Sequence, residues 1–217
     1  VQMDTRFGGR RNVDWHPWVI LAQRKGALIR RVPITVCGHL DLSDIERIIT
    51  PKTKLLAICH ASNVLGTINP IAELARRARE FGAVVVADGA QAAPHMVIDV
   101  QQTHADFYAF SAHKMLGPTG VGVLWGRREL LESMTPFNYG GEMIREVGYE
   151  RITFNELPWK FEAGTPNIAD VVAFDEALTY LEEIGMDRIR AHEMTLTKYA
   201  LERLSEIRGI EIQGPQD

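Results

Sequence analysis

Residues 83–91 read AVVVADGAQ, five apolar residues followed directly by an acid, two small residues and an amide. The run Ala83–Ala87 does not alternate between polar and apolar residues, so a strand formed from it has two apolar faces. Such strands are typical of parallel sheets that helices cover on both sides. Asp88 and Gln91 follow at the carboxyl end of the strand, where ligands bind in open α/β sheets. The stretch therefore predicts a central parallel strand with candidate binding residues at its end.

Other apolar runs alternate with helical patterns on both sides of this strand. Asn69-Pro70 is a helix start, because the Asn side chain can cap and Pro needs no donor there. The apolar stripe of that helix is Ile71, Leu74, Ala75, Ala78 and Phe81, and Gly82 ends it. Further strands are predicted at Ala27–Ile34, Leu55–Cys59, Phe107–Phe110 and Val121–Trp125. The alternation predicts an α/β fold with an open, mostly parallel sheet and right-handed crossovers.

The pattern changes after this predicted sheet. Ile168–Ile184 and Arg188–Ile207 predict two consecutive long helices, and Ile210–Ile212 looks like the start of a strand. We therefore predict two parts, a large α/β domain over residues 1–167 and connecting helices with the start of a smaller domain over residues 168–217. Because the chain stops as a strand begins, we expect the second part to be incomplete.

The composition excludes several classes of function. The 217 residues are 46% hydrophobic and 24% charged, as in ordinary globular proteins. A net charge of -4 argues against nucleic acid as a partner, and no run of ~18 apolar residues is present that could span a membrane. No signal-peptide pattern stands at the start. Cys37 and Cys59 lack CxxC spacing and fit a reducing compartment. We expect a cytoplasmic protein that acts on a small molecule.

Polar side chains follow three of the predicted strands. His60, Ser62 and Asn63 come after the first, Asp88 and Gln91 after the second, and Ser111, His113 and Lys114 after the third. If these strands are neighbours in a parallel sheet, their carboxyl ends form one edge. The sequence then predicts that a carboxylate, an amine, an imidazole, amides and hydroxyls meet in one crevice.

Asp88 and Lys114 together indicate a particular chemistry. A lysine amine can add to an aldehyde and form a Schiff base. The biological aldehyde used most in this way is pyridoxal 5'-phosphate, whose ring nitrogen needs an anion beside it. Ser111 and His113 can donate hydrogen bonds to a phosphate, and the nearby Gly117, Gly120 and Gly122 would let the backbone approach it. The pattern is that of a pyridoxal-phosphate site.

Simpler interpretations of the same residues exist. An Asp at a strand end is often a turn or helix cap, and a Lys on a turn is usually a solvated surface charge. The GPTGVG stretch has neither the dinucleotide-binding nor the phosphate-loop order of glycines. Two Cys-His groupings, Cys37 with His39 and Cys59 with His60, match no zinc spacing, so we predict no metal site.

A series of longer motifs distinguishes these interpretations. The chain contains HASNVLGTINP (residues 60–70), VVVADGAQAAPH (84–95), ADFYAFSAHKMLGPTGVGVLWG (105–126), NYGGEMI (138–144) and FEAGTPN (161–167). From about Pro17 to its end the sequence resembles the cysteine desulfurases of the class-V aminotransferase family, and DGAQ and GGEMI favour the Suf-type group. The resemblance implies the fold-type-I pyridoxal-phosphate architecture, with a large domain containing a mostly parallel sheet, a small domain and a homodimer.

The resemblance also implies roles for individual residues. Lys114 would form the Schiff base with the cofactor and, with His113, make up the catalytic pair. Asp88 would face the ring nitrogen, Gln91 would hydrogen-bond the ring hydroxyl, and Ala90 would pack on a ring face.

Other residues would hold the remaining groups. Ser111 and His113 would bind the phosphate, and Thr165 would reach the phosphate bound in the other subunit. Asn63 would lie near the ring hydroxyl and the substrate carboxylate.

The activity implied is conversion of L-cysteine to L-alanine, with sulfur passed as a persulfide into iron-sulfur cluster assembly. A sulfur-acceptor protein of the Suf system would be a partner. Other class-V chemistries remain open, namely selenocysteine lyase, aminotransferase and epimerase. A further alternative is that these 217 residues are a non-catalytic fragment.

The sequence departs from the family pattern in several places. Where the family has a histidine that stacks on the ring, this chain has RRNVDWH, with Arg11 or Asn12 in the histidine's place. Neither Cys37 nor Cys59 matches the persulfide-forming position. A glycine- and threonine-rich phosphate loop, the catalytic cysteine and a carboxylate-binding arginine are expected outside residues 1–217. The chain therefore looks like a central piece of a desulfurase, with its large domain incomplete at the N-terminus.

Overall fold

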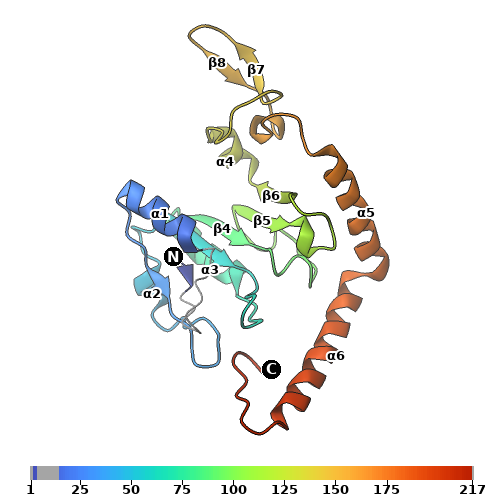
Figure 1. Cartoon of the computed structure of the whole chain (residues 1–217). Coiled ribbons are helices and arrows are strands. Elements are labelled where there is room, and N and C mark those ends of the chain that lie inside the picture. The colour runs from blue at the N-terminus through green and yellow to red at the C-terminus, as the bar shows by residue number, and fades with distance from the viewer. Residues whose placement is uncertain (1, 4–14, 217) are drawn as a thin grey trace.

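The computed structural model describes residues 2–3 and 15–216. A central sheet lies beside a helical layer, a β-hairpin projects from one end, and two long helices run along one side (Figure 1). The predicted replacement of the ring-stacking histidine by Arg11 or Asn12 falls outside the described residues.

The central sheet contains four strands in the order β3-β4-β5-β6. Their bounds are Leu55–Cys59 for β3, Val84–Asp88 for β4, Phe107–Ser111 for β5 and Gly122–Gly126 for β6. β3, β4 and β5 are parallel, and only β6 runs antiparallel to its neighbour. The predicted α/β fold with a mostly parallel sheet is confirmed, and the run at residues 83–87 supplies a strand in its interior.

Helix α3 (Ile71–Glu80) connects β3 to β4 and covers one face of the sheet. The predicted stripe is its buried side, with Ile71, Leu74, Ala75 and Ala78 at most 2% exposed. Gly82 follows with a φ of +68°, the left-handed conformation that ends helices. The predicted Asn69 cap is wrong. The Asn69 side chain donates from Nδ2 to the Cys59 carbonyl oxygen at 2.8 Å and so ties the helix start to the end of β3.

The two faces of β4 are buried unequally. Val85 and Ala87 are completely buried on the side of α3, whereas Val84 and Val86 on the other side are only partly buried. Within the described residues, the face of β4 toward α3 is fully covered, as expected, and the other face is only partly covered.

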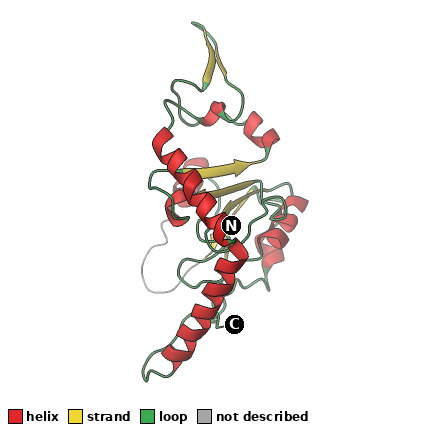
Figure 2. Ribbon diagram, turned by 90° about the vertical axis from the view of Figure 1, so that its right-hand side faces the viewer, coloured by secondary structure: helices red, strands yellow, loops and turns green. Residues whose placement is uncertain are grey.

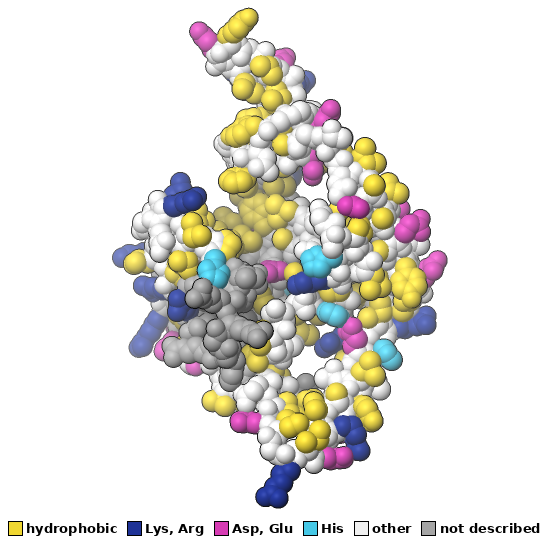
Figure 3. All heavy atoms as spheres, viewed as in Figure 1, with side chains coloured by type: hydrophobic (Ala, Val, Ile, Leu, Met, Phe, Trp, Pro, Cys, Tyr) yellow, Lys and Arg dark blue, Asp and Glu magenta, His cyan; other side chains and the backbone are white. Residues whose placement is uncertain are grey.

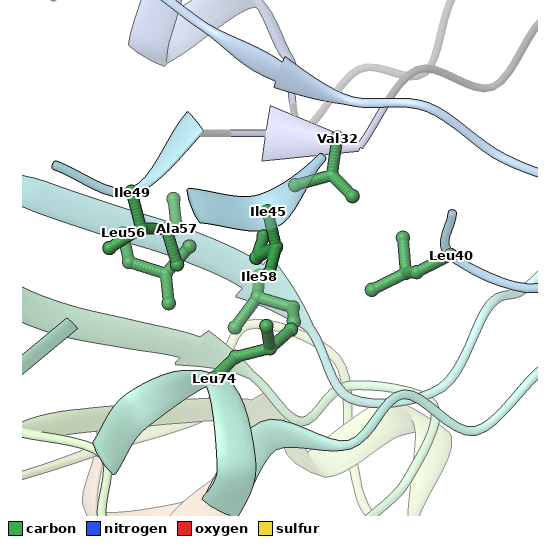
Figure 4. Close-up of a pocket in the computed structure, with 8 residues that line it drawn as sticks. All are labelled: Val32, Leu40, Ile45, Ile49, Leu56, Ala57, Ile58 and Leu74. Carbon is green, nitrogen blue, oxygen red and sulfur yellow. The ribbon is translucent and has the colours of Figure 1, made fainter. Parts of the chain in front are cut away.

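The N-terminal elements extend the core beyond β3. They are β1 (Gln2–Met3), α1 (Trp15–Lys25), β2 (Arg31–Val32) and α2 (Ile45–Ile48). Eight apolar residues from β2, α2, β3, α3 and the loop at Leu40 enclose a cavity of about 10 Å³ (Figure 4). The lining offers water no hydrogen-bond partner, so this is a packing gap rather than a binding site.

The strand predicted over Ala27–Ile34 is mostly wrong. Only Arg31–Val32 pairs with a neighbouring strand. Its first residues finish helix α1, since the Ala27 amide donates to the Ala22 carbonyl oxygen at 2.9 Å. Leu28 is 94% exposed, and Pro33 has no amide hydrogen to donate to a sheet.

Beyond β6 the chain leaves the sheet. It forms α4 (Arg128–Ser133), a hairpin of β7 (Ile144–Val147) and β8 (Ile152–Phe154), a turn η2 (Trp159–Phe161), and the helices α5 (Ile168–Ile184) and α6 (Met186–Ser205). Figure 2 shows the hairpin clear of the sheet, and α5 and α6 run down in front of the sheet. No described helix is apolar enough over a sufficient length to cross a membrane.

The predicted helix over residues 168–184 is confirmed at both ends. The second helix begins two residues earlier than predicted, directly after Gly185, whose φ of +89° breaks the helical path. The strand predicted at Ile210–Ile212 does not form, because no described strand lies beside it to accept backbone hydrogen bonds.

Asp106 holds the amino-terminal edge of the sheet together. Its Oδ2 accepts the Val85 amide of β4 at 2.8 Å, and its Oδ1 accepts Arg79 of α3 at 2.9 Å and Arg127 at 3.1 Å. The carboxylate is 5% exposed. Burying a carboxylate without partners costs free energy, so Asp106 depends on these contacts. Through them it connects the sheet to α3.

We expect Asp106→Asn to lower the free energy of unfolding by about 3 kcal/mol, because it leaves two guanidinium groups facing an amide. Urea denaturation of the full-length gene product measures this change. The control is Glu46→Gln, which removes an Arg77 ion pair whose acid is 82% exposed, and we expect it to cost about 0.5 kcal/mol or less. Equal losses in the two variants would contradict the structural role given to Asp106.

Candidate active site

The carboxyl ends of β3, β4 and β5 form one edge, as predicted. Cys59 lies opposite Asp88, and Asp88 lies opposite Ala109, in the hydrogen-bonded register of the three strands. Ser111 ends β5 two residues further on. The polar groups that follow each strand are therefore brought to the same edge.

Alternation along the strands separates two sets of side chains. Asp88 and its register partners Cys59 and Ala109 point to one face. Ala87 pairs with Tyr108, so the Tyr108 ring lies on the opposite face, which α3 covers. Asp88 is thus presented on the less covered side of the sheet.

The Asp88 carboxylate is half-buried at the end of β4. Its Oδ1 accepts the Ala90 amide at 2.9 Å, which closes the turn after the strand. Among the described residues no Lys, Arg or His forms an ion pair with it, and its Oδ2 has no hydrogen-bond partner. The turn-cap interpretation is therefore correct for one oxygen, and the other oxygen is available to a cationic group.

Lys114 ends a single 3-10 turn, η1 (Ala112–Lys114), that follows β5 directly. The Ala112 carbonyl oxygen accepts the amides of Met115 at 2.8 Å and Gly117 at 3.0 Å, and the Ala112 amide donates to Val121 at 3.1 Å. Ala112 is fully buried, whereas His113 and Lys114 are exposed. A buried backbone turn thus fixes the position of an exposed imidazole and amine.

The glycines after Lys114 have packing and turn roles that the sequence did not predict. A Cβ on Gly117 would lie 2.6 Å from Phe174 of α5, and a Cβ on Gly122 would lie 3.1 Å from the Phe110 carbonyl oxygen. Gly120 has a φ of +85° in the turn before β6. Close approach to protein atoms and turn geometry account for these three glycines within the described structure.

Gly89 also makes a close approach, beneath the turn at Asp88. A Cβ at this position would lie 2.0 Å from Cε1 and 2.5 Å from the hydroxyl oxygen of Tyr108. The Tyr108 hydroxyl lies 2.8 Å from His60 Nδ1, and the two rings meet edge to face with centroids 5.8 Å apart. Sequence reasoning gave Tyr108 no role, because an aromatic residue inside a strand normally indicates only a core position.

Burial shifts the ionisation of this pair. It lowers the pKa of His60 below the usual value, so the imidazole is neutral near neutral pH. Burial, followed by the charges of Asp88 and Cys59, raises the pKa of Tyr108 far above the usual value, so the phenol keeps its proton. The contact is a hydrogen bond between neutral groups.

Gln91 lines a cleft of about 360 Å³ between this edge of the sheet and helix α6. Across the cleft, His95 Nδ1 lies 2.7 Å from Glu193 Oε1 of α6. In the space-filling view, histidine, basic and acidic side chains gather between the sheet and the two long helices (Figure 3). This cleft, rather than the small apolar cavity of Figure 4, is the larger described opening next to the predicted site residues.

Two predicted residues have no described contact with this group. Asn63 is exposed on the turn after β3, where Ser62 Oγ accepts the amides of Val64 and Leu65. Thr165 is exposed just before α5, and no described contact joins it to the Lys114 turn. The structure therefore brings Asp88, Ser111 and Lys114 to adjacent strand ends, and no described contact connects Thr165 to them.

The donor set fits pyridoxal phosphate. At one edge stand an acid with an available oxygen, which suits a ring nitrogen, and a hydroxyl and an imidazole, which suit a phosphate. An amine suited to an aldehyde and an amide suited to a ring hydroxyl stand at the same edge. The side chains of Gln91, Ser111, His113 and Lys114 make no hydrogen bond within the described part of the chain. They are therefore available to a ligand.

A family profile described as aminotransferase class-V matches residues 13–217. The chain belongs to this family. Class-V relatives include proteins named probable cysteine desulfurase from Halalkalibacterium halodurans, 52% identical over 92% of this chain, and from Streptomyces coelicolor, 54% identical over 92%. The chain spans 49% and 48% of these two relatives, about half of their length.

Solved structures of the same family share this fold. The cysteine desulfurase CsdA of Escherichia coli is 40% identical with a TM-score of 0.85, over 89% of this chain and 48% of its own. An apo cysteine desulfurase from Thermococcus onnurineus NA1 is 38% identical with a TM-score of 0.91, over 100% of this chain and 53% of its own. The predicted fold-type-I fold with a mostly parallel sheet is confirmed.

We expect Gly89→Ala to lower the free energy of unfolding by about 3 kcal/mol, at the upper end of the cost of overpacking, because the added methyl group overlaps the Tyr108 ring. Urea denaturation of the full-length gene product measures it. Gly141→Ala is the control, since nothing lies within 4 Å of its Cβ position. In the double variant with Tyr108→Ala the losses should not add, and simple additivity would show that the overlap is not the cause.

Proposed function

We propose that the protein is a pyridoxal-phosphate-dependent cysteine desulfurase of the Suf type, which converts L-cysteine to L-alanine. One observation carries the proposal, the convergence of Asp88 and the Lys114 turn at adjacent strand ends of a class-V fold. Relatives and solved structures named cysteine desulfurases support the choice of substrate.

In this proposal the chain's own side chains hold the cofactor at its ring and at its phosphate. Asp88 faces the ring nitrogen, with Gln91 at the ring hydroxyl, Ala90 on a ring face and Asn63 nearby. Ser111 and His113 bind the phosphate, and Thr165 contributes to the phosphate site of a second subunit in a homodimer. When bound, pyridoxal phosphate supplies an electron-accepting ring that stabilises negative charge on the substrate carbon.

Lys114 and Asp88 then have distinct tasks. The Lys114 amine binds the cofactor and moves protons at the substrate, for which its exposed position on a rigid turn suits it. The Asp88 carboxylate keeps the ring nitrogen positively charged, which strengthens electron withdrawal. His113, the neighbour of Lys114, is the second member of the proposed catalytic pair.

The sulfur step needs a thiolate acceptor. The substrate carbon–sulfur bond breaks and a sulfur–sulfur bond forms on the acceptor, so cysteine and a thiol give alanine and a persulfide without an added oxidant. Cys37 is exposed but lies on the loop before α2, and Cys59 is half-buried with its Sγ 3.1 Å from the Ala61 carbonyl oxygen. We assign the thiol that first accepts the sulfur to residues outside this chain. In the proposal, the persulfide formed there is then transferred to an acceptor protein for iron-sulfur cluster assembly.

The state of the cysteines bears on the compartment. Neither Cys37 nor Cys59 is in a disulfide. Reduced thiols are typical of the cytoplasm, and we propose that the protein works there.

We expect Lys114→Ala to reduce cysteine turnover by at least ~100-fold, because proton transfer by a positioned amine is lost. Sulfide and alanine released by the full-length gene product, loaded with pyridoxal phosphate, measure turnover. Borohydride reduction followed by peptide mass mapping should place the cofactor on residue 114. The matched control is Lys52→Ala, an exposed lysine outside the site.

The outcomes separate the alternatives. Absence of a cofactor adduct at residue 114, or full turnover in the Lys114→Ala variant, contradicts the proposal. Turnover of selenocysteine but not cysteine, or amino transfer without sulfide, supports another class-V chemistry. Turnover by the 217-residue chain itself, above its own Lys114→Ala variant, rules out the fragment alternative.

A further inference from the structure

We propose that His60 and Tyr108 are positioning residues for Asp88. Their hydrogen-bonded pair supports the Asp88–Gly89 backbone from the face opposite the carboxylate, and so holds that carboxylate toward the nitrogen of the cofactor ring. The inference rests on the proposed function, because it concerns how the same site binds its cofactor.

The backbone around Asp88 is held on both sides by neighbouring strands. The His60 amide donates to the Asp88 carbonyl oxygen at 2.7 Å, and the Gly89 amide donates to the Ala109 carbonyl oxygen at 2.8 Å. One of these contacts is therefore made by His60 itself, and the other by Ala109, the direct neighbour of Tyr108. A shift of either ring moves the peptide groups that set the direction of the Asp88 side chain.

The Tyr108 ring fills the space directly behind this backbone. Its atoms lie where a Gly89 side chain would stand, and the residue is 1% exposed. The ring touches the peptide on one face and Asp88 projects from the other. The ring therefore prevents the Asp88–Gly89 backbone from moving away from the face on which the carboxylate lies.

His60 fixes the far end of the Tyr108 ring. The distance of 2.8 Å between His60 Nδ1 and the Tyr108 hydroxyl links β3 to β5 across the end of β4. The edge-to-face angle of 87° between the rings restricts rotation of both. The pair thus bridges the strand that carries Asp88, on the face opposite the Asp88 carboxylate.

A tyrosine hydroxyl in any core needs a partner, so the hydrogen bond alone would fit a purely structural role. The two roles differ in what they predict about the ring nitrogen. A structural pair affects every ligand of the site alike. A positioning pair affects a ligand only through the Asp88 contact, and its effect disappears when the ligand has no ring nitrogen.

The test measures dissociation constants of the full-length gene product for pyridoxal phosphate and for its 1-deaza analogue, in which a carbon replaces the ring nitrogen. Fluorescence titration after removal of the cofactor gives both values. The variants are Tyr108→Phe, which keeps the ring behind Gly89 and removes only the hydroxyl, and His60→Leu. His60→Asn is the conservative variant, since its amide can occupy the Nδ1 position. Tyr180→Phe on α5, 54% exposed, is the control.

We expect Tyr108→Phe and His60→Leu to weaken pyridoxal-phosphate binding by about 5- to 20-fold, as when one hydrogen bond to a charged group is disturbed. Binding of the deaza analogue should change by less than about 2-fold, and the double variant should be no worse than either single one. His60→Asn should recover most of the affinity, and Tyr180→Phe should match wild type.

Other results overturn the inference in distinguishable ways. Equal weakening for both ligands shows a structural pair only, and unchanged binding in Tyr108→Phe and His60→Leu shows that the pair has no influence on Asp88. If wild type binds the two ligands equally, the assignment of Asp88 to the ring nitrogen fails and the inference fails with it. If wild type binds neither, the proposed function itself is wrong.

Discussion

The hydrogen-bonded register of three parallel strands is the constraint on which the site depends. Because β3, β4 and β5 run the same way and stay in register through Cys59, Asp88 and Ala109, their carboxyl ends finish beside one another. Residues separated by more than twenty positions in the chain are thereby brought to one edge. The side chains there need no contact with one another, since the backbone alone sets their spacing. The pairing of the strands therefore determines where the site lies, and the side chains determine which groups it presents.

Polar groups at the amino-terminal edge of the sheet differ from those at its carboxyl edge in whether they have protein partners. At the amino-terminal edge, the buried charge of Asp106 is fully engaged by Arg79, Arg127 and the Val85 amide. At the carboxyl edge, Lys114, His113 and one oxygen of Asp88 have no partner among the described residues. Polar groups whose hydrogen bonds are satisfied within the protein hold the fold together, whereas groups without a protein partner can contact solvent or a ligand. The position of Lys114 and Asp88 at adjacent strand ends, rather than their lack of partners alone, is what favours a chemical role over a surface role.

Sequence reasoning predicted the parts of this fold that local pattern determines. The strand at residues 55–59, the buried stripe of α3 and the helix over residues 168–184 follow from periodicity and breakers. Ala27–Ile34 and Ile210–Ile212 look like strands locally, but a strand also needs a neighbour to pair with, and pairing is a long-range property.

The candidate site shows the same division. The residues proposed to carry the chemistry could be named from the sequence, because their order after successive strands and their motifs are local. The Tyr108–His60 pair and the contact of Gly117 with Phe174 could not, because each joins residues from distant parts of the chain. The contacts of these glycines with other parts of the protein were missed for this reason, since a glycine's neighbours in space do not appear in its sequence context.

The contact between Gly117 and Phe174 has an evolutionary consequence. The loop after Lys114 and helix α5 meet there with no room for a methyl group. A larger residue at position 117 would be tolerated only together with a smaller one at position 174, so these two sites should covary among homologous sequences. The identity of one residue on a remote helix thereby limits which substitutions natural selection can accept in the loop that follows Lys114.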